Sequence, residues 1–165
     1  MNIYIDTEFT DFFINPALIS IGMVADDRRE FYAELNDTYD ESMCSLFVIQ
    51  TVLPILWGKE YEMDIGTLAG KLKAWIESFN EPVTLWADAP NYDWKWIAQI
   101  FDQSAGWPVN LERKCKNTLI LATASYQTFC DEYWRLSKND SAVQHHALWD
   151  VRCIQYAHQI DSIDF

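Results

Sequence analysis

Three strand-like runs follow one another near the start of the chain and limit the folds open to it. Residues 2–6 alternate apolar side chains with other side chains, which predicts a strand with two different faces. Leu18–Ala25 is almost continuously apolar, as is typical of a strand at the centre of a sheet. The acidic pair at 26–27 suits a turn, and Glu30–Leu35 again reads as a strand. The pattern predicts an antiparallel meander of three strands.

Helix-like and strand-like runs alternate after the meander. Apolar spacing predicts helices over residues 42–57 and 65–79, although Pro54 is a flaw in the first of them. A strand is expected over Val83–Ala87, followed by a helix that begins at residue 91 or 93 and runs to about residue 101. Strands that alternate with helices indicate an α/β domain with a mixed sheet.

The rest of the chain is less regular. A fifth strand is expected between residues 109 and 121, without a firmer position. Helices are predicted over residues 128–136 and 147–160. No repeat or linker divides the chain, so we expect a single domain over residues 1–165.

Composition narrows the class of protein. Half of the 165 residues are hydrophobic, which is ample for a core and excludes disorder. The net charge of −13 repels polyanions at long range, so any nucleic-acid footprint should be short. The apolar run over residues 46–57 is far short of a membrane span, and the N-terminus has no basic region of a secretory signal. We therefore expect a cytoplasmic protein without a membrane segment.

Acidic residues recur where the predicted elements begin and end. Asp6 and Glu8 lie two residues apart and project from one face of a strand. Asp93 stands at a helix start, and Asp150 lies inside the last predicted helix, after His145. Four carboxylates from separated elements are suited to two hard divalent cations, Mg²⁺ or Mn²⁺, which prefer oxygen ligands. Two such ions can support hydrolysis of a phosphodiester.

These residues form motifs that resemble a known family. The segments at residues 6–9 (Asp-Thr-Glu-Phe), 88–93 and 145–150 are similar to the three exonuclease motifs of the DEDDh superfamily. The resemblance is strongest to its small mycobacterial-type 3′–5′ exoribonuclease branch, in which Leu-Ile-Ser-Ile-Gly, here at residues 18–22, and Trp-Ala-Asp, here at residues 86–88, are typical. It covers residues 1 to about 157 and weakens over residues 107–140.

The resemblance implies an RNase H-like fold, in which helices flank a five-stranded mixed sheet. It also implies an enzyme that removes nucleotides from the 3′ end of RNA. It implies that Asp6, Glu8 and Asp150 hold one of two Mg²⁺ or Mn²⁺ ions. Asp6 would bridge to the second ion, and Asp93 would act largely through water. Relatives in the family are often dimers, so a homodimer is a further expectation, although no interface can be read from the sequence.

The general base could be either of two neighbouring histidines. Residues four apart share a helix face, so His146 would lie over Asp150 if both were helical. The family's spacing of five selects His145, which requires this residue to lie on the loop before the helix. On the strength of this resemblance we expect His145 to be the base, a role that suits a histidine because an imidazole can accept a proton near neutral pH.

Other residues suggest how a nucleotide is held. The resemblance implies that Thr7 and Phe9 contact the substrate, Phe9 at the terminal nucleotide. The basic clump at residues 113–116 is either a phosphate contact or an ordinary solvated loop. Nothing in the sequence indicates a 2′-hydroxyl contact, so two alternatives stay open. One is a 3′–5′ exodeoxyribonuclease acting on single-stranded DNA, and the other is a catalytically idle module that binds nucleic acid or protein.

Overall fold

The computed structural model describes residues 1–13, 15–120 and 122–162 of the chain, and its core is a single mixed sheet. The strands are β1 (Asn2–Phe9), β2 (Leu18–Ala25), β3 (Glu30–Leu35), β4 (Glu62–Met63), β5 (Val83–Ala87) and β6 (Leu111–Asn117). The α-helices are α1 (Ile65–Glu77), α2 (Pro90–Ile100), α3 (Tyr126–Leu136) and α4 (Ala147–Asp161). The α/β class expected from the sequence is confirmed.

The six strands lie in the order β4-β3-β2-β1-β5-β6. Strands β1, β2 and β3 form the expected antiparallel meander, and β5 and β6 extend the sheet in parallel from β1. The fifth strand expected between residues 109 and 121 is therefore β6. The expectation of five strands is wrong by one, because β4 pairs with β3 through only Glu62 and Met63. Two residues are too few to produce a periodic pattern.

The predicted helix over residues 42–57 is also wrong as a single element. It consists of a 3₁₀ turn at Glu41–Met43, a wider π turn at Val48–Val52 and a second 3₁₀ turn at Leu53–Ile55. Pro54 explains the last break, because it has no N–H to donate to a preceding carbonyl. The Leu53 N–H donates to the Val48 carbonyl, five residues back, as the coil widens before the proline.

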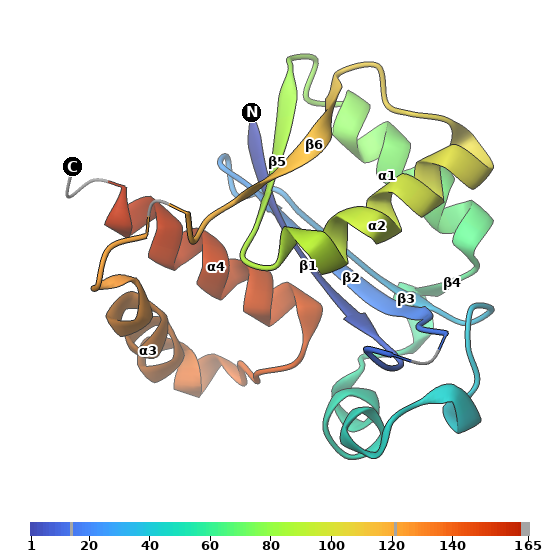
Figure 1. Cartoon of the computed structure of the whole chain (residues 1–165), viewed down its shortest axis with the longest axis horizontal. Coiled ribbons are helices and arrows are strands. Elements are labelled where there is room, and N and C mark those ends of the chain that lie inside the picture. The colour runs from blue at the N-terminus through green and yellow to red at the C-terminus, as the bar shows by residue number, and fades with distance from the viewer. Residues whose placement is uncertain (14, 121, 163–165) are drawn as a thin grey trace.

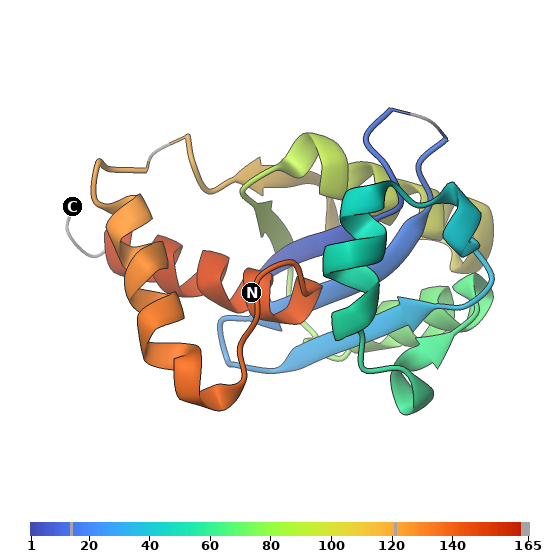
Figure 2. The ribbon, with the colours of Figure 1, turned by 90° about the horizontal axis from the view of Figure 1, so that it is seen from below.

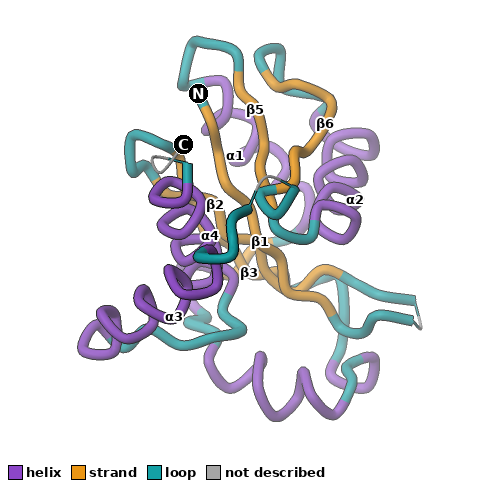
Figure 3. Tube along the Cα trace, turned by 60° about the vertical axis from the view of Figure 1, so that its left-hand side comes forward, coloured by secondary structure: helices purple, strands orange, loops and turns teal. Residues whose placement is uncertain are grey.

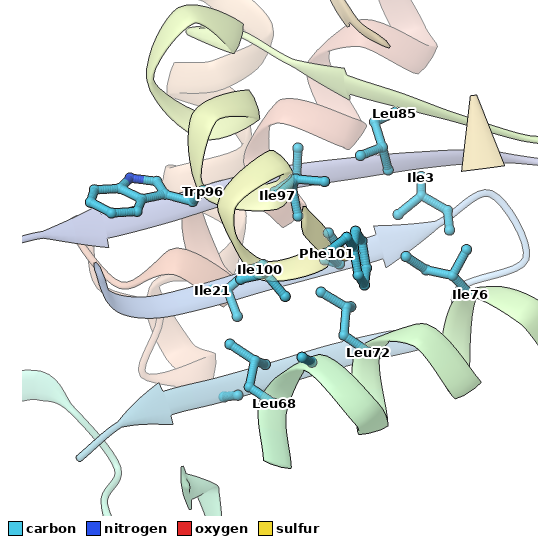
Figure 4. Packing of buried hydrophobic residues seen from close by; sticks show 14 of the residues in the cluster. Ile3, Ile21, Leu68, Leu72, Ile76, Leu85, Trp96, Ile97, Ile100 and Phe101 are labelled. Carbon is cyan, nitrogen blue, oxygen red and sulfur yellow. The ribbon is translucent and has the colours of Figure 1, made fainter. Parts of the chain in front are cut away.

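Helices cover both faces of the sheet (Figures 1 and 2). Helices α1 and α2 pack on one face, where their apolar side chains meet those of the strands in the largest core cluster. Figure 4 shows this packing, with Leu72 of α1 and Ile97 of α2 near Ile3 of β1. Helix α4 covers the opposite face, where Val151 packs against Tyr4. Strand β1 therefore separates two differently occupied layers.

Strand β1 is longer than the predicted run of residues 2–6. Its pairing with β2 continues through Asp6 opposite Gly22 and Glu8 opposite Ser20, with an irregularity just before Phe9. The carboxylates consequently project from a rigid, paired strand rather than from the loop after it. Figure 3 shows β1 running between α4 on one side and α2 on the other.

Candidate active site

A cavity of about 590 Å³ opens where β1, α2 and α4 meet. Its lining includes every residue nominated from the sequence: Asp6, Thr7, Glu8, Phe9, Asp93, His145 and Asp150. These residues come from three elements and one loop that are far apart along the chain. The fold therefore brings the whole nominated set to one place.

Three of the carboxylates form a compact cluster. One oxygen from each of Asp6, Glu8 and Asp150 lies within 4.8 Å of the others. Asp6 and Glu8 share the face of β1 that α4 covers, because side chains two residues apart point to the same side of a strand. Asp150 lies in the first turn of α4, close to the helix N-terminus.

A glycine allows α4 to approach the sheet closely enough to complete this cluster. Gly22 of β2 lies opposite Asp6, and a Cβ atom added to it would lie 2.4 Å from the Ala147 carbonyl carbon and oxygen. No flexible side chain is available to move aside, because the neighbouring atoms belong to the backbone of α4. The missing side chain of Gly22 therefore sets the distance between Asp150 and β1.

Asp93 enters the cavity from the other layer of the fold. It is buried in the first turn of α2, and its Oδ1 accepts a hydrogen bond of 2.7 Å from the Thr7 hydroxyl. Thr7 faces α2 because its side chain alternates with those of Asp6 and Glu8 along β1. Burial raises the pKa of Asp93 to about 7, and the Thr7 hydrogen bond opposes that rise.

Burial and mutual repulsion disfavour the ionised state of the other three acids. Burial, followed by the charges of Asp93, Asp150 and Glu8, raises the pKa of Asp6 well above its ordinary value. Burial, followed by the charges of Asp150 and Asp93, raises the pKa of Glu8 to about 8. Burial raises the pKa of Asp150 to about 7, against the opposing effect of the His145 backbone N–H. The cluster therefore stores electrostatic repulsion that a cation would relieve.

His145 lies on the loop just before α4, with its exposed side chain at the cavity. Its backbone has a φ of 67°, a left-handed conformation that is uncommon for residues other than glycine. This conformation accompanies a 2.8 Å hydrogen bond from the His145 N–H to Asp150 Oδ2. The imidazole also meets the Phe47 ring edge-on, with centroids 5.0 Å apart.

His146 lies in a different environment. Its side chain is 1% exposed, stacks on Tyr32 with ring centroids 4.6 Å apart, and meets the Trp57 ring at a tilt with centroids 4.5 Å apart. Neither ring nitrogen has a hydrogen-bond partner among the described residues, and burial lowers the pKa of His146 to about 4. The helix-face argument for His146 does not apply, because α4 begins only at Ala147.

Aromatic rings form the other side of the cavity. Phe9 is half-buried and stacks on Tyr92, and Phe12 meets Tyr92 edge-on with centroids 5.4 Å apart. The exposed fractions of Phe12 and Phe13 are 59% and 90%, unusually large for such apolar side chains. Phe47, from the broken helix, joins this side and was not nominated from the sequence. The sequence offered no signal for it, because the segment was expected to be one regular helix.

Asp88 also lines the cavity, although it was not nominated as a site residue from the sequence. Burial raises its pKa, and its charge adds to the repulsion on Asp6. A signal was present: Asp88 directly follows β5, which is parallel to β1, and the carboxyl ends of parallel neighbours meet at one sheet edge.

The donor set of the cavity fits hard divalent cations. Its polar groups are mainly carboxylate oxygens, and no lysine or arginine is among the described residues that line it. Oxygen donors are what Mg²⁺ and Mn²⁺ prefer. Burial and then the neighbouring carboxylates raise the pKa of Asp6 and Glu8, so a bound cation would favour their ionised form.

Comparison with known proteins gives the family. In the described part of the chain, no helix has the length and apolar character needed to cross a membrane. A search of curated proteins found no match to the chain. A family model described as the 3′-5′ exoribonuclease Rv2179c-like domain matches residues 1–160, which include all of the cavity-lining side chains named above. The chain therefore belongs to the Rv2179c-like 3′-5′ exoribonuclease domain family.

Proposed function

We propose that this chain is a metal-dependent 3′–5′ exoribonuclease of the DEDDh type, with an RNase H-like fold and one domain over residues 1–165. The observation that carries the proposal is the carboxylate cluster of Asp6, Glu8 and Asp150, joined by Asp93 in one cavity. Family membership supports the exoribonuclease activity. The mixed sheet with helices on both faces is compatible with an RNase H-like fold.

The carboxylates would hold two Mg²⁺ or Mn²⁺ ions. Asp6, Glu8 and Asp150 would bind one ion, Asp6 would also face the second, and Asp93 would contribute mainly through water. When bound, two such metal ions activate a water molecule and neutralise the charge that develops on the phosphate and on the leaving oxygen. The role of the protein is to hold these carboxylate oxygens on a paired strand and at a helix end, so that the site needs little rearrangement when the ions bind.

His145 is our candidate for the general base. Its exposed imidazole faces the cavity, and the bond from its N–H to Asp150 fixes its backbone beside the cluster. In this role the imidazole takes a proton from the attacking water and releases it to solvent. His146 is buried and is not among the described residues that line the cavity, so it is a structural residue in this proposal.

Thr7 and Phe9 keep their proposed contacts with the substrate. Phe9 lines the cavity, where its ring can touch the base of the terminal nucleotide. The Thr7 hydroxyl donates its hydrogen to Asp93, so a side-chain contact from Thr7 to substrate would use the hydroxyl oxygen as an acceptor. A homodimer and a cytoplasmic location stay predictions.

A labelled-strand assay tests the function. RNA and DNA of one sequence, each with a 5′ label, are incubated with Mn²⁺, and a ladder that shortens from the 3′ end of RNA is expected. Asp6→Asn should abolish the ladder, whereas Asp131→Asn removes the same charge at an exposed site on α3 and should leave it intact. A ladder on DNA alone favours the exodeoxyribonuclease, and binding without any ladder favours the idle module.

A further inference from the structure

A lysine stands beside the aromatic side of the cavity without an acidic partner. The Lys95 ammonium lies 5.4 Å from the centroid of the Phe9 ring and 4.4 Å from that of Trp96. Within the described ranges it forms no salt bridge, although the chain carries 25 acidic residues against 12 lysines and arginines. An unpaired cation in so acidic a protein is available for an anionic ligand.

The position of Lys95 links it to the cavity. It lies one turn after Tyr92 on the same face of α2, and Tyr92 lines the cavity. Among the cation–ring contacts of the described residues, only that of Lys95 involves a ring of the cavity lining, namely Phe9. The basic residues singled out from the sequence do not line the cavity, since Arg113 lies over Trp107 and Lys116 over Trp86.

We propose that Lys95 binds the phosphate on the 5′ side of the nucleotide just upstream of the scissile bond, an inference that rests on the proposed function. The 3′-terminal nucleotide of RNA carries only the scissile phosphate, which must lie at the carboxylate cluster. A second phosphate beside the cavity can therefore belong only to the upstream nucleotide. The exposed Phe12 and Tyr92 rings offer a stacking surface for its base.

This subsite fits the charge of the chain. Beyond one upstream phosphate, a longer strand would meet an acidic surface, because the net charge is −13. A single lysine thus suits a very short substrate better than a long tracked strand. The smallest RNA that can use the subsite is a dinucleotide with a 5′ phosphate.

Two dinucleotides isolate the contact. Diadenylate with a 5′ phosphate (pApA) and without it (ApA) share the scissile bond and differ only in the phosphate assigned to Lys95. We expect the wild-type chain in Mn²⁺ to hydrolyse pApA with a kcat/KM roughly fivefold higher, the value of one exposed ion pair. Lys95→Met keeps most of the apolar stem and should remove this preference while leaving ApA hydrolysis unchanged. Lys95→Arg should retain it.

Controls separate the subsite from other effects. Lys71→Met makes the same charge change on an exposed part of α1 and should keep the preference. With pApA, log kcat/KM should fall less steeply with added salt in Lys95→Met than in the wild type, because salt screens the attraction between Lys95 and the phosphate. Equal losses on both dinucleotides, or no wild-type preference, would overturn the subsite alone. Hydrolysis of neither dinucleotide by the wild type, together with no ladder on RNA, would overturn the proposed function as well.

Discussion

The His145 backbone N–H donates to Asp150 Oδ2 over 2.8 Å, so the candidate base and a candidate metal ligand are joined through the main chain. The bond requires no imidazole, and the φ of 67° at His145 suits glycine. The two functions of this residue, fixing Asp150 and accepting a proton, can therefore be separated by mutation.

His145→Gly should retain Mn²⁺ binding and lose turnover. The glycine keeps the N–H and relieves the strained backbone, whereas loss of the base lowers kcat by roughly 10²- to 10⁴-fold. Added imidazole should restore part of the activity. Calorimetric titration with Mn²⁺ and rates with and without imidazole check this prediction. Wild-type turnover in the glycine variant would remove His145 from the mechanism.

His146→Phe should preserve activity and fold stability. Phenylalanine keeps a planar ring in contact with Tyr32 and Trp57 and removes two buried nitrogens that have no hydrogen-bond partner among the described residues. Thermal unfolding and kcat, measured beside His145→Gly, provide the comparison. A folded His146→Phe variant without turnover would reverse the assignment of the two histidines.

Gly22→Ala should weaken both folding and metal binding. Its methyl group would meet the backbone of α4, and overpacking of this kind costs typically about 1–3 kcal/mol. Any relief moves α4 outward and carries Asp150 away from Asp6. Gly70→Ala is the matched control, because a Cβ there meets nothing within 4 Å and alanine favours a helix interior. Equal Mn²⁺ affinity in the two variants would contradict the role of Gly22.

Thr7→Val should impair Asp93 while Thr7→Ser should not. Valine preserves the shape of threonine but removes the hydroxyl that donates to Asp93, and this loss raises the pKa of Asp93 further. We expect weaker Mn²⁺ binding and a lower kcat in Thr7→Val, with recovery in Thr7→Ser. A change confined to KM would instead indicate that Thr7 acts mainly on substrate.

Without divalent ions, the protein should become less stable as the pH rises from about 5 to 8. The pKa values of Glu8 and Asp150 are raised to about 8 and 7, so the folded state binds protons more tightly than the unfolded chain. That stabilisation is complete at acidic pH and is lost as these groups ionise. Melting temperatures across this range, with and without Mg²⁺, test the prediction.

Added Mg²⁺ should restore the stability lost at higher pH, because it binds the folded state. At a hundred times its Kd it should raise the free energy of unfolding by about 2.7 kcal/mol. Asp6→Asn should flatten the pH dependence and reduce the response to Mg²⁺, because it removes one of the repelling charges. A metal-free melting temperature that rises with pH over this range would contradict the repulsion inferred for the cluster.

The meander, and the placement of Asp6 and Glu8 on one strand face, could be predicted because both depend on local periodicity. Asp93, Asp150 and His145 were nominated instead from their places near predicted helix starts and from the resemblance to the exonuclease motifs. The period of two places Asp6 and Glu8 on one face, and the apolar run of Leu18–Ala25 marks a central strand. Strand β6 could be placed only loosely, because its sequence Leu-Glu-Arg-Lys-Cys-Lys-Asn is that of a polar edge strand without an apolar pattern.

Features that arise from packing could not be read in the same way. The close approach at Gly22 exists only after α4 has docked on β2, and Lys95 is significant only because β1 brings Phe9 beneath it. The bond between Thr7 and Asp93 joins residues 86 positions apart. The choice between His145 and His146 depended on where α4 begins, and helix boundaries are the least certain feature of a sequence pattern.

The alternation along β1 has a consequence for folding intermediates. Asp6 and Glu8 face one layer of the fold and Thr7 the other, so a pairing slip by a single residue would turn every one of them to the wrong side. A misregistered chain would then present its carboxylates beneath α1 and α2 and a threonine beneath α4. Nuclease activity should therefore appear only when β1 reaches its native pairing. Partly folded chains would then not cut RNA.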